Sequence, residues 1–363
     1  MQRTEQRRDK LRKLIHKSGA QAMLVTNETN VTYLTGFTGD SSFLLLTKSN
    51  EVLLTDARYT TQLEEECPGL TLEVRGPGTK TLALAEKVVK KAKLNKIAIE
   101  ADSTSLSMYE ALSNQLAKVE LIQTSGLVEQ LREIKDKEEV NAIRHAVRLA
   151  EKAFAVVRSS LRPDQTEREI AHHLEQQIRL FGGDCCSFNP IVAVGPWAAL
   201  PHATPGDRRI QEDDFVLIDW GAKERLYLSD LTRVLVTGKI SPKLQRIYEV
   251  VLKAQRSAIE KIAPGVPMKD VDAAARKVIA GAGHDKHFGH GLGHGIGLEI
   301  HEQPRMASTE KRTLKAGMVV TVEPGIYLPG WGGVRIEDDI LVTRSGHEVL
   351  SCVPKELANC VVD

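Results

Sequence analysis

Short apolar runs alternate with amphipathic segments along the first third of the chain. Runs rich in Val, Leu and Ile are bounded by turn residues, which predicts short strands. Segments whose apolar residues recur every three to four positions predict helices. The expected strands lie within residues 21–26, 41–47, 51–55, 70–74 and 96–100, and the expected helices lie within residues 1–18, 80–93 and 106–117. This alternation is typical of an α/β domain.

Helical periodicity then dominates between residues 126 and 181. The second helix of this region is expected to begin at Thr166, because Glu169 three residues later completes a capping box. Gly182 and Gly183 are expected to end it. Apolar side chains at helical spacing precede it at Val140, Ile143, Val147, Ala150, Phe154 and Val157.

Strand patterns return after residue 190, and two helical patterns interrupt them. The expected strands lie within residues 190–195, 214–221, 225–238, 317–328 and 333–343, and the helices lie near 241–262 and 268–282. This mixture predicts an α+β C-terminal domain. We expect a boundary within residues 125–135 and assign the domains to residues 1–128 and 129–363.

Composition narrows the function classes. The 363 residues include 49 Lys and Arg against 48 Asp and Glu, a net charge of +1, which argues against non-specific binding of nucleic acid. No apolar run approaches the ~20 residues of a membrane span, and the charged start of the chain lacks the apolar core of a secretory signal. Five cysteines without a C-x-x-C spacing argue against a disulfide framework and a thiolate zinc site. We expect a cytoplasmic protein with no nucleic-acid or membrane partner.

Histidines gather in a glycine-rich segment, HFGHGLGHGIGLEIHE, at residues 287–302. Each glycine costs about 1 kcal/mol in a helix interior, so His290 and His294 are not expected to form a helical zinc pair. Glycine allows close approach of the backbone to a ligand. The alternative is a glycine-rich turn with incidental histidines.

Two aspartates interrupt neighbouring apolar strand patterns. The midpoint between Asp219 and Asp230 falls between Glu224 and Arg225. If a hairpin turns there, the two carboxylates face each other with Cβ atoms ~4.5–5.5 Å apart. They would repel unless a cation lies between them. The alternative is that one caps the turn and the other is solvated.

Further carboxylates lie at strand ends. Glu323 closes an apolar run before a Pro-Gly turn, and Arg335, Glu337 and Asp339 share one face of an expected strand. One glutamate at a strand end is usually a surface residue. A set of four carboxylates and one imidazole, however, suits Mn, Co, Fe or Zn and a two-metal site. That set is Asp219, Asp230, His294, Glu323 and Glu337.

The motifs that carry these residues resemble a known family. IDWGA, YLSDLTR, GHGLGHGIGLEIHE, VEPGIY and VRIEDDI occur in this order, and NVTYLTGFTG and LLTDARY precede them. Together they resemble the pita-bread metallopeptidases of the aminopeptidase P and Xaa-Pro dipeptidase (prolidase) group. One departure is Val234, where related sequences often carry threonine; Thr232 and Arg233 remain.

The resemblance implies a dinuclear centre. Asp219 would chelate one ion, Asp230 and Glu337 would bridge both, and His294 and Glu323 would complete the second. The ions would be two divalent cations, with Mn²⁺ preferred and Co²⁺ or Zn²⁺ as alternatives. A hydroxide bridging them would attack the scissile carbonyl, and Glu323 would also carry the proton.

The resemblance also implies roles around the metals. His301 would hydrogen-bond the substrate carbonyl, His202 would help to position proline, His290 would line the pocket, and Arg335 would support the bridging glutamate. Asp338 and Asp339 are expected to lie behind the ligands or in solvent. His284 and His287 have no assigned role and are expected in solvent.

The expected activity is metal-dependent hydrolysis of the Xaa-Pro bond at the N-terminus of peptides, or of dipeptides alone, by a homodimer. Methionine aminopeptidase shares the ligands but usually lacks such an N-terminal domain, and creatinase lacks the full ligand set. A non-catalytic pita-bread binding protein is the remaining alternative. Such proteins have typically lost ligands that this chain retains.

Overall fold

The structure, a computed structural model, describes residues 2–211 and 215–362. Contacts between residues divide the chain into two compact units, Met1–Arg132 and Glu133–Asp363. Each unit has its own sheets and its own hydrophobic core. The domain limits at residues 128 and 129 stay a prediction. In the described part of the chain, no helix combines the length and the apolar character that crossing a membrane requires.

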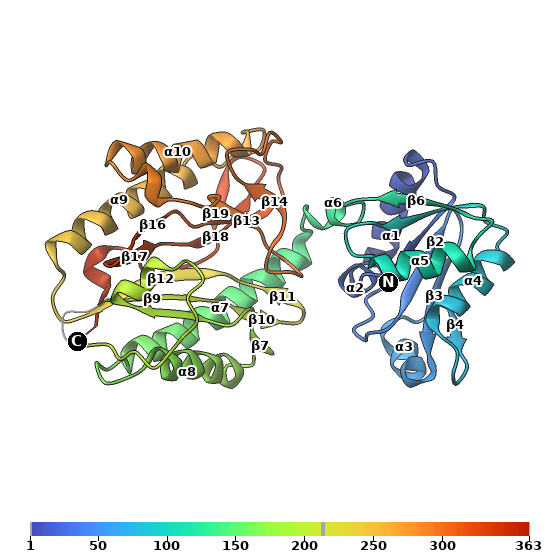
Figure 1. Cartoon of the computed structure of the whole chain (residues 1–363), viewed down its shortest axis with the longest axis horizontal. Coiled ribbons are helices and arrows are strands. Elements are labelled where there is room, and N and C mark those ends of the chain that lie inside the picture. The colour runs from blue at the N-terminus through green and yellow to red at the C-terminus, as the bar shows by residue number, and fades with distance from the viewer. Residues whose placement is uncertain (1, 212–214, 363) are drawn as a thin grey trace. The chain divides into compact units, whose positions relative to one another are not determined.

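The N-terminal unit is an α/β structure, as expected (Figure 1). Its strands are β1 (Ala22–Val25), β2 (Phe43–Thr47), β3 (Glu51–Asp56), β4 (Thr71–Arg75), β5 (Lys96–Glu100) and β6 (Glu120–Thr124). Its helices are α1 (Gln2–Lys17), α2 (Glu28–Thr35), α3 (Thr60–Glu66), α4 (Thr81–Lys91), α5 (Leu106–Gln115) and α6 (Glu129–Arg132). The strands form one mixed sheet in the order β4-β3-β2-β1-β5-β6, and Leu24 and Leu54 of this sheet belong to the same buried cluster as Val88 of α4.

Helices α2 and α3 and strand β6 were not expected from the sequence. Helix α2 is short, and its start depends on Asn27, whose side chain accepts a hydrogen bond from the Asn30 N–H. It ends at Gly36, which adopts a positive φ of 86°. Two turns of helix contain too few residues for a clear helical period, so local capping decided this element.

The C-terminal unit contains four long helices among its described residues. These are α7 (Lys137–Ser159), α8 (Glu167–Leu180), α9 (Pro242–Ile259) and α10 (Met268–Gly281). The capping box predicted at Thr166 and Glu169 is confirmed. Helices α7 and α8 share one buried cluster with the strands that precede α9, and α9 and α10 share another with the later strands. Figure 1 shows the strands lying between these two helical pairs.

Within residues 133–211 and 215–362, the strands of this unit form four sheets. They are β7 (Cys185–Cys186), β8 (Ile191–Val194), β9 (Phe215–Trp220), β10 (Ala222–Glu224), β11 (Tyr227–Leu228), β12 (Leu231–Thr237), β13 (Gly293–Gly295), β14 (Glu302–Met306), β15 (Val319–Val322), β16 (Gly325–Leu328), β17 (Gly332–Arg335), β18 (Asp338–Val342), β19 (His347–Val349) and β20 (Val361–Val362). The two larger sheets have the orders β20-β12-β9-β8 and β14-β13-β15-β18-β19. The smaller ones are β11-β10-β7 and β16-β17.

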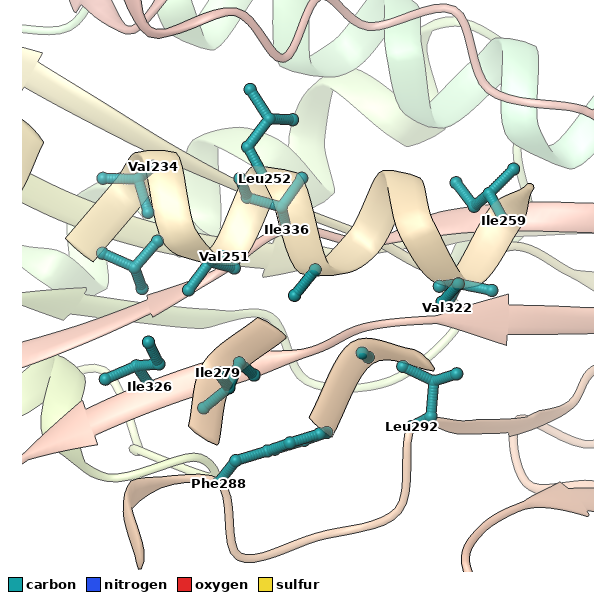
Figure 2. Packing of buried hydrophobic residues seen from close by; sticks show 14 of the residues in the cluster. Val234, Val251, Leu252, Ile259, Ile279, Phe288, Leu292, Val322, Ile326 and Ile336 are labelled. Carbon is teal, nitrogen blue, oxygen red and sulfur yellow. The ribbon is translucent and has the colours of Figure 1, made fainter. Parts of the chain in front are cut away.

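The core beneath these sheets is apolar and closely packed. Figure 2 shows Val251 of α9 and Ile279 of α10 with Val322 and Ile326, which lie on β15 and β16. All four side chains are buried. Strand β15 is followed by Glu323, so the core fixes the position from which this carboxylate projects.

The β9–β12 hairpin has a different register from the one predicted. Its turn is centred on Arg225 and Leu226, both with positive φ (46° and 76°), as in a type I′ turn. Asp219 therefore pairs with Thr232, and the expected direct pairing of Asp219 with Asp230 is wrong. Because the shift is two residues, Asp230 still lies on the same face as Asp219, as a diagonal neighbour.

The strand expected across residues 333–343 is in fact two strands. Strand β17 pairs with β16, whereas β18 pairs with β15. Ile336 and Glu337 lie between them. At this break the Glu337 N–H donates a 3.2 Å hydrogen bond to the carbonyl of Thr232, which brings Glu337 to the β9–β12 hairpin.

Candidate active site

Five residues expected to bind metal come from five separate places in the C-terminal unit. Asp219 lies on β9, Asp230 precedes β12, His294 lies on β13, Glu323 follows β15, and Glu337 lies between β17 and β18. The side chains of Asp219, Asp230 and Glu337 are almost completely buried. Strand ends from separate sheets thus bring acidic groups into the interior.

Three of these residues form a compact cluster that could hold a metal ion. Ligand atoms of Asp230, His294 and Glu337 all lie within 4.8 Å of one another. His294 Nε2 is 3.6 Å from Asp230 Oδ2 and 3.4 Å from Glu323 Oε1. Asp219 joins the group through Arg335, which donates a hydrogen bond to its Oδ2, while its Oδ1 is buried without a hydrogen-bond partner.

The electrostatics of the cluster favour a bound cation. Burial, followed by the charge of Glu337, raises the pKa of Asp230 well above its usual value. Burial and the charge of Glu323 do the same for Glu337. Burial also raises the pKa of Glu323 to about 8, although Arg335 opposes the shift. Carboxylates this close need added positive charge to stay ionised together, which divalent cations supply.

His294 is in the protonation state that metal binding requires. Burial, followed by the charge of His301, lowers the pKa of His294 to about 4, so its imidazole is neutral near pH 7. Its Nδ1 is 3.1 Å from the carbonyl of Gly295, which leaves Nε2 directed towards Asp230 and Glu323. A neutral imidazole among carboxylates, together with the orphaned Asp219 oxygen, fits an oxygen-rich divalent metal site.

Thr232 connects two of the predicted residues. Its hydroxyl donates a 2.6 Å hydrogen bond to Glu337 Oε2 and accepts a 3.1 Å hydrogen bond from Arg335 Nε. The remaining guanidinium nitrogens of Arg335 bond Asp219 and the Tyr327 hydroxyl. Arg335 thus contacts Asp219 directly and reaches Glu337 through Thr232.

Tyr327 is the residue that the sequence did not single out. Its hydroxyl lies 2.9 Å from Arg335 Nη1 and 2.9 Å from His290 Nε2. Because a guanidinium only donates, the Tyr327 oxygen accepts from Arg335 and its proton points to His290 Nε2. The available signal was its place in VEPGIY, on a strand that pairs with the Arg335 strand.

His290 is held neutral at the end of this chain of hydrogen bonds. Its Nδ1 is 2.8 Å from the carbonyl of Gly291 and acts as the donor, since Nε2 accepts from Tyr327. Burial, followed by the charge of Arg335, lowers the pKa of His290 to about 4. His290 is therefore a fixed wall of the site and not a titrating group near neutral pH.

His202 and His301 are exposed, unlike the predicted ligands. The ring of His301 packs edge-on against that of His294, with centroids 4.4 Å apart. Partial burial, followed by the charge of His202, lowers the pKa of His301, so the two exposed histidines lie near each other. His301 thus lies beside His294 at the solvent side of the cluster.

Asp338 and Asp339 lie behind the cluster and not in solvent. Both are buried. Asp338 accepts hydrogen bonds from Arg233, Gln255, Ser351 and Lys355. Asp339 accepts a 3.0 Å bond from the Asp230 backbone N–H. These acids anchor the segments that carry Glu337 and Asp230.

His284 and His287 are half-buried and contact each other, with Nδ1 atoms 3.3 Å apart.

Comparison with known proteins identifies the family. Residues 141–344 match the metallopeptidase family M24, and residues 7–134 match the creatinase/prolidase N-terminal domain. An Xaa-Pro dipeptidase structure from Bacillus anthracis is 39% identical, with a TM-score of 0.95 and 99% of each chain covered. An X-Pro aminopeptidase structure from Thermotoga maritima MSB8 is 35% identical, with a TM-score of 0.87 and 93% of this chain and 97% of that chain covered.

Sequence relatives agree with these structures. An uncharacterized peptidase of Bacillus subtilis (strain 168) is 38% identical over 96% of this chain and 98% of its own length. The match extends through both units, so it includes the N-terminal domain as well as the region of the acidic cluster. The protein therefore belongs to metallopeptidase family M24 and is a peptidase with a creatinase/prolidase N-terminal domain and a pita-bread catalytic domain.

Proposed function

We propose that this protein is an Xaa-Pro dipeptidase that uses two divalent cations. The proposed ligands are Asp219, Asp230, His294, Glu323 and Glu337. Their burial, their proximity and the raised pKa values of the acids support this set. When bound, the cations supply Lewis acidity that lowers the pKa of a water molecule and polarises the peptide carbonyl.

The residues around the cations orient the substrate and move its protons. Glu323, which would be ionised beside the bound cations, would accept a proton and return it to the proline nitrogen as the bond breaks. His301 would donate a hydrogen bond to the oxygen of the scissile carbonyl. His202, near His301 on the solvent side, would contact the proline ring.

The position of Arg305 favours a dipeptide over a longer peptide as the substrate. It pairs directly with His294 in the β13–β14 ladder, so both side chains project from the same face of the sheet. Burial is the main reason that the pKa values of His294 and His301 are lowered, and the charge of Arg305 adds to both shifts. Arg305 is exposed, and neither a hydrogen bond nor an ion pair of its guanidinium is found within residues 2–211 and 215–362.

A cation without a carboxylate partner beside the scissile bond is complementary to an anionic substrate group. In an Xaa-Pro dipeptide the C-terminal carboxylate follows directly after the proline, one residue beyond that bond. A longer peptide would place a neutral amide there. Charge-assisted bonds between arginine and carboxylate are among the stronger hydrogen bonds in proteins, so Arg305 would select the dipeptide.

The metal identity, the assembly and the location are proposed from the sequence. Mn²⁺ is the proposed metal, with Co²⁺ or Zn²⁺ as alternatives, because an oxygen-rich site with one imidazole accepts all three. A homodimer in the cytoplasm is the expected form.

The test is a parallel assay of the full-length protein. We would remove metal, add Mn²⁺ or Co²⁺, and measure hydrolysis of Ala-Pro, Arg-Pro-Pro and Met-Ala-Ser. Cleavage of Ala-Pro alone is the expected result. Preferential cleavage of Arg-Pro-Pro would instead favour an aminopeptidase P activity. Cleavage of Met-Ala-Ser alone would contradict the proline preference, and no turnover with any metal would contradict the proposed function.

A further inference from the structure

The glycine-rich segment that carries His290 and His294 is held in part by side chains outside it. Glycine occupies every second position from residue 289 to residue 297, and glycine backbones are conformationally permissive. At Gly293 there is also no room for a side chain, because a Cβ there would lie 2.1 Å from the carbonyl oxygen of Thr321. The positions of His290 and His294 therefore depend in part on groups outside the segment.

Those groups act on alternate residues of the segment. The carbonyls of Phe288 and His290 accept hydrogen bonds from Arg276 Nη1 and Nη2. The Leu292 N–H donates a 3.1 Å bond to Asp272 Oδ1. The His294 N–H donates a 3.1 Å bond to the hydroxyl of Thr321. Two of these four positions carry the site histidines themselves.

Asp272 and Arg276 form one unit on helix α10. They are four residues apart, and Arg276 Nε donates a 2.7 Å hydrogen bond to Asp272 Oδ2. The Asp272 side chain is completely buried, and Arg276 also lies over the ring of Phe288, 4.3 Å from its centroid. The backbone at three alternate positions, 288, 290 and 292, is thus held by side chains from a single turn of α10.

The pinned segment is linked directly to Glu323. The carbonyl of Leu292 accepts a 2.8 Å hydrogen bond from the Glu323 N–H. A shift of Leu292 would therefore move Glu323, the proposed ligand that follows β15, as well as His294. The same shift would separate His290 from the Tyr327 hydroxyl, which now lies 2.9 Å from its Nε2.

We propose that the Asp272–Arg276 pair is a positioning device for the metal site, because it fixes the backbone of residues 288–292, which carries His290 and leads into His294. Neither residue contacts the cluster of ligand atoms, so both act through the segment. The effect on catalysis rests on the proposed function. The effect on metal affinity does not depend on which peptide is cleaved.

Four variants of the full-length protein test this role. Arg276→Met removes the donors but keeps an apolar chain over Phe288. Arg276→Lys retains the charge but cannot reproduce the two-pronged geometry. Asp272→Asn keeps an acceptor for the Leu292 N–H and removes the charge. Lys277→Met, which removes an exposed cation from the same helix, is the matched control.

Two readouts separate positioning from simple support of the fold. The first is the affinity of the metal-stripped protein for Mn²⁺, measured by calorimetry. The second is kcat and KM for the best substrate, compared with the Tm of each variant. Removing a group that orients a metal ligand costs about 10- to 100-fold in affinity or activity.

We expect Arg276→Met to lose about that factor in both Mn²⁺ affinity and kcat, with little change in KM. Arg276→Lys and Asp272→Asn should each lose less Mn²⁺ affinity and less kcat than Arg276→Met does. Lys277→Met should match the wild type. A lower Tm with unchanged Mn²⁺ affinity and kcat would overturn the proposal. If the wild type cleaves no peptide, the Mn²⁺ affinities still decide this point.

Hydrogen exchange of the wild-type protein covers the case in which Arg276→Met does not fold. The Leu292 amide should be protected even without metal, because Asp272 accepts its hydrogen bond in the interior. Exchange of the Leu292 amide at the rate of an open glycine-rich loop would overturn the proposal without any variant.

Discussion

Asp219 lies directly opposite Thr232 in the β9–β12 ladder. The Thr232 hydroxyl donates to Glu337, so this pair links the first hairpin of the site to the break between β17 and β18. Asp230 is displaced diagonally on the same face, where such neighbours are ~7–8 Å apart. This spacing leaves more room for cations between the aspartates than a directly opposed pair would.

Glu337→Gln should abolish metal-dependent turnover while the fold remains. The substitution keeps the size of a fully buried side chain but removes the charge that a bridging ligand needs. Loss of a group that only orients a metal ligand lowers activity by up to about 100-fold. We expect the loss of a ligand itself to lower activity by more than this. Metal content and circular dichroism of the purified variant check this result. Near wild-type activity with metal supplied would show that Glu337 does not bridge.

Tyr327→Phe should lower kcat and leave KM nearly unchanged. The ring would still pack, but Arg335 Nη1 and His290 Nε2 would lose their shared partner. An unsatisfied buried donor costs about 1–3 kcal/mol, so we also expect lower stability. Tyr109→Phe, a half-buried tyrosine of the N-terminal unit, is the control. Unchanged kcat would mean that the Arg335–Tyr327–His290 chain does not affect the reaction.

His301→Ala and His294→Ala should have different effects although their rings touch. His294 belongs to the cluster of ligand atoms, so its loss should lower metal content. His301 is exposed and is proposed to stabilise the transition state, so its loss should lower kcat far more than metal content. Elemental analysis and steady-state kinetics on both variants decide this. Equal metal loss in the two variants would make His301 a ligand or a structural support.

Much of the fold was predictable because its signals are local. The capping box at Thr166 and Glu169 depends on residues within one helical turn, so it was visible in the sequence. The register of the β9–β12 pair was not visible in the sequence. Its turn residues, Arg225 and Leu226, adopt positive φ, yet neither belongs to the Gly, Asn or Asp types that usually mark such turns.

The site shows the same division between local and long-range information. Candidate ligands such as Glu323 could be named because a carboxylate that closes an apolar run stands out in the sequence, and their metal roles stay a prediction. Tyr327 could not be named, because its importance comes from two contacts, to His290 and Arg335, on other segments. Asp272 and Arg276 have an ordinary ion-pair spacing for a helix, so only the path of the glycine-rich segment reveals what they hold.

The stability of the metal-free protein should depend on pH through Glu323. Burial raises the pKa of this carboxyl to about 8, with Arg335 opposing and Asp219 adding to the shift. A group with a higher pKa when folded binds more protons in the folded state, so the free energy of unfolding falls as the pH rises. The fall should extend from the ordinary glutamate value of about 4.3 to about 8.

Urea unfolding in the presence of a chelator measures this dependence. Glu323→Gln should make the fall with pH shallower. Asp230 and Glu337, which also have raised pKa values, add to the fall, whereas His290 and His294, with pKa values lowered to about 4, oppose it up to about pH 6.5. The exposed Glu260, replaced by Gln, should leave the slope unchanged. An identical slope in Glu323→Gln and the wild type would contradict the assigned protonation state.

Arg305→Met should change which peptides are cleaved. If the guanidinium binds the carboxylate of an Xaa-Pro dipeptide, its removal costs a hydrogen bond to a charged group, about 1.5–3 kcal/mol. We therefore expect KM for Ala-Pro to rise by about 10- to 100-fold, while metal content stays constant because Arg305 is not a ligand. Hydrolysis of Arg-Pro-Pro, which places an amide at that point, should change little. Arg344→Met, at another exposed position of the same unit, is the control for lost positive charge. An equal effect of Arg305→Met on both peptides would mean that Arg305 supports the site in general and does not read the end of the substrate.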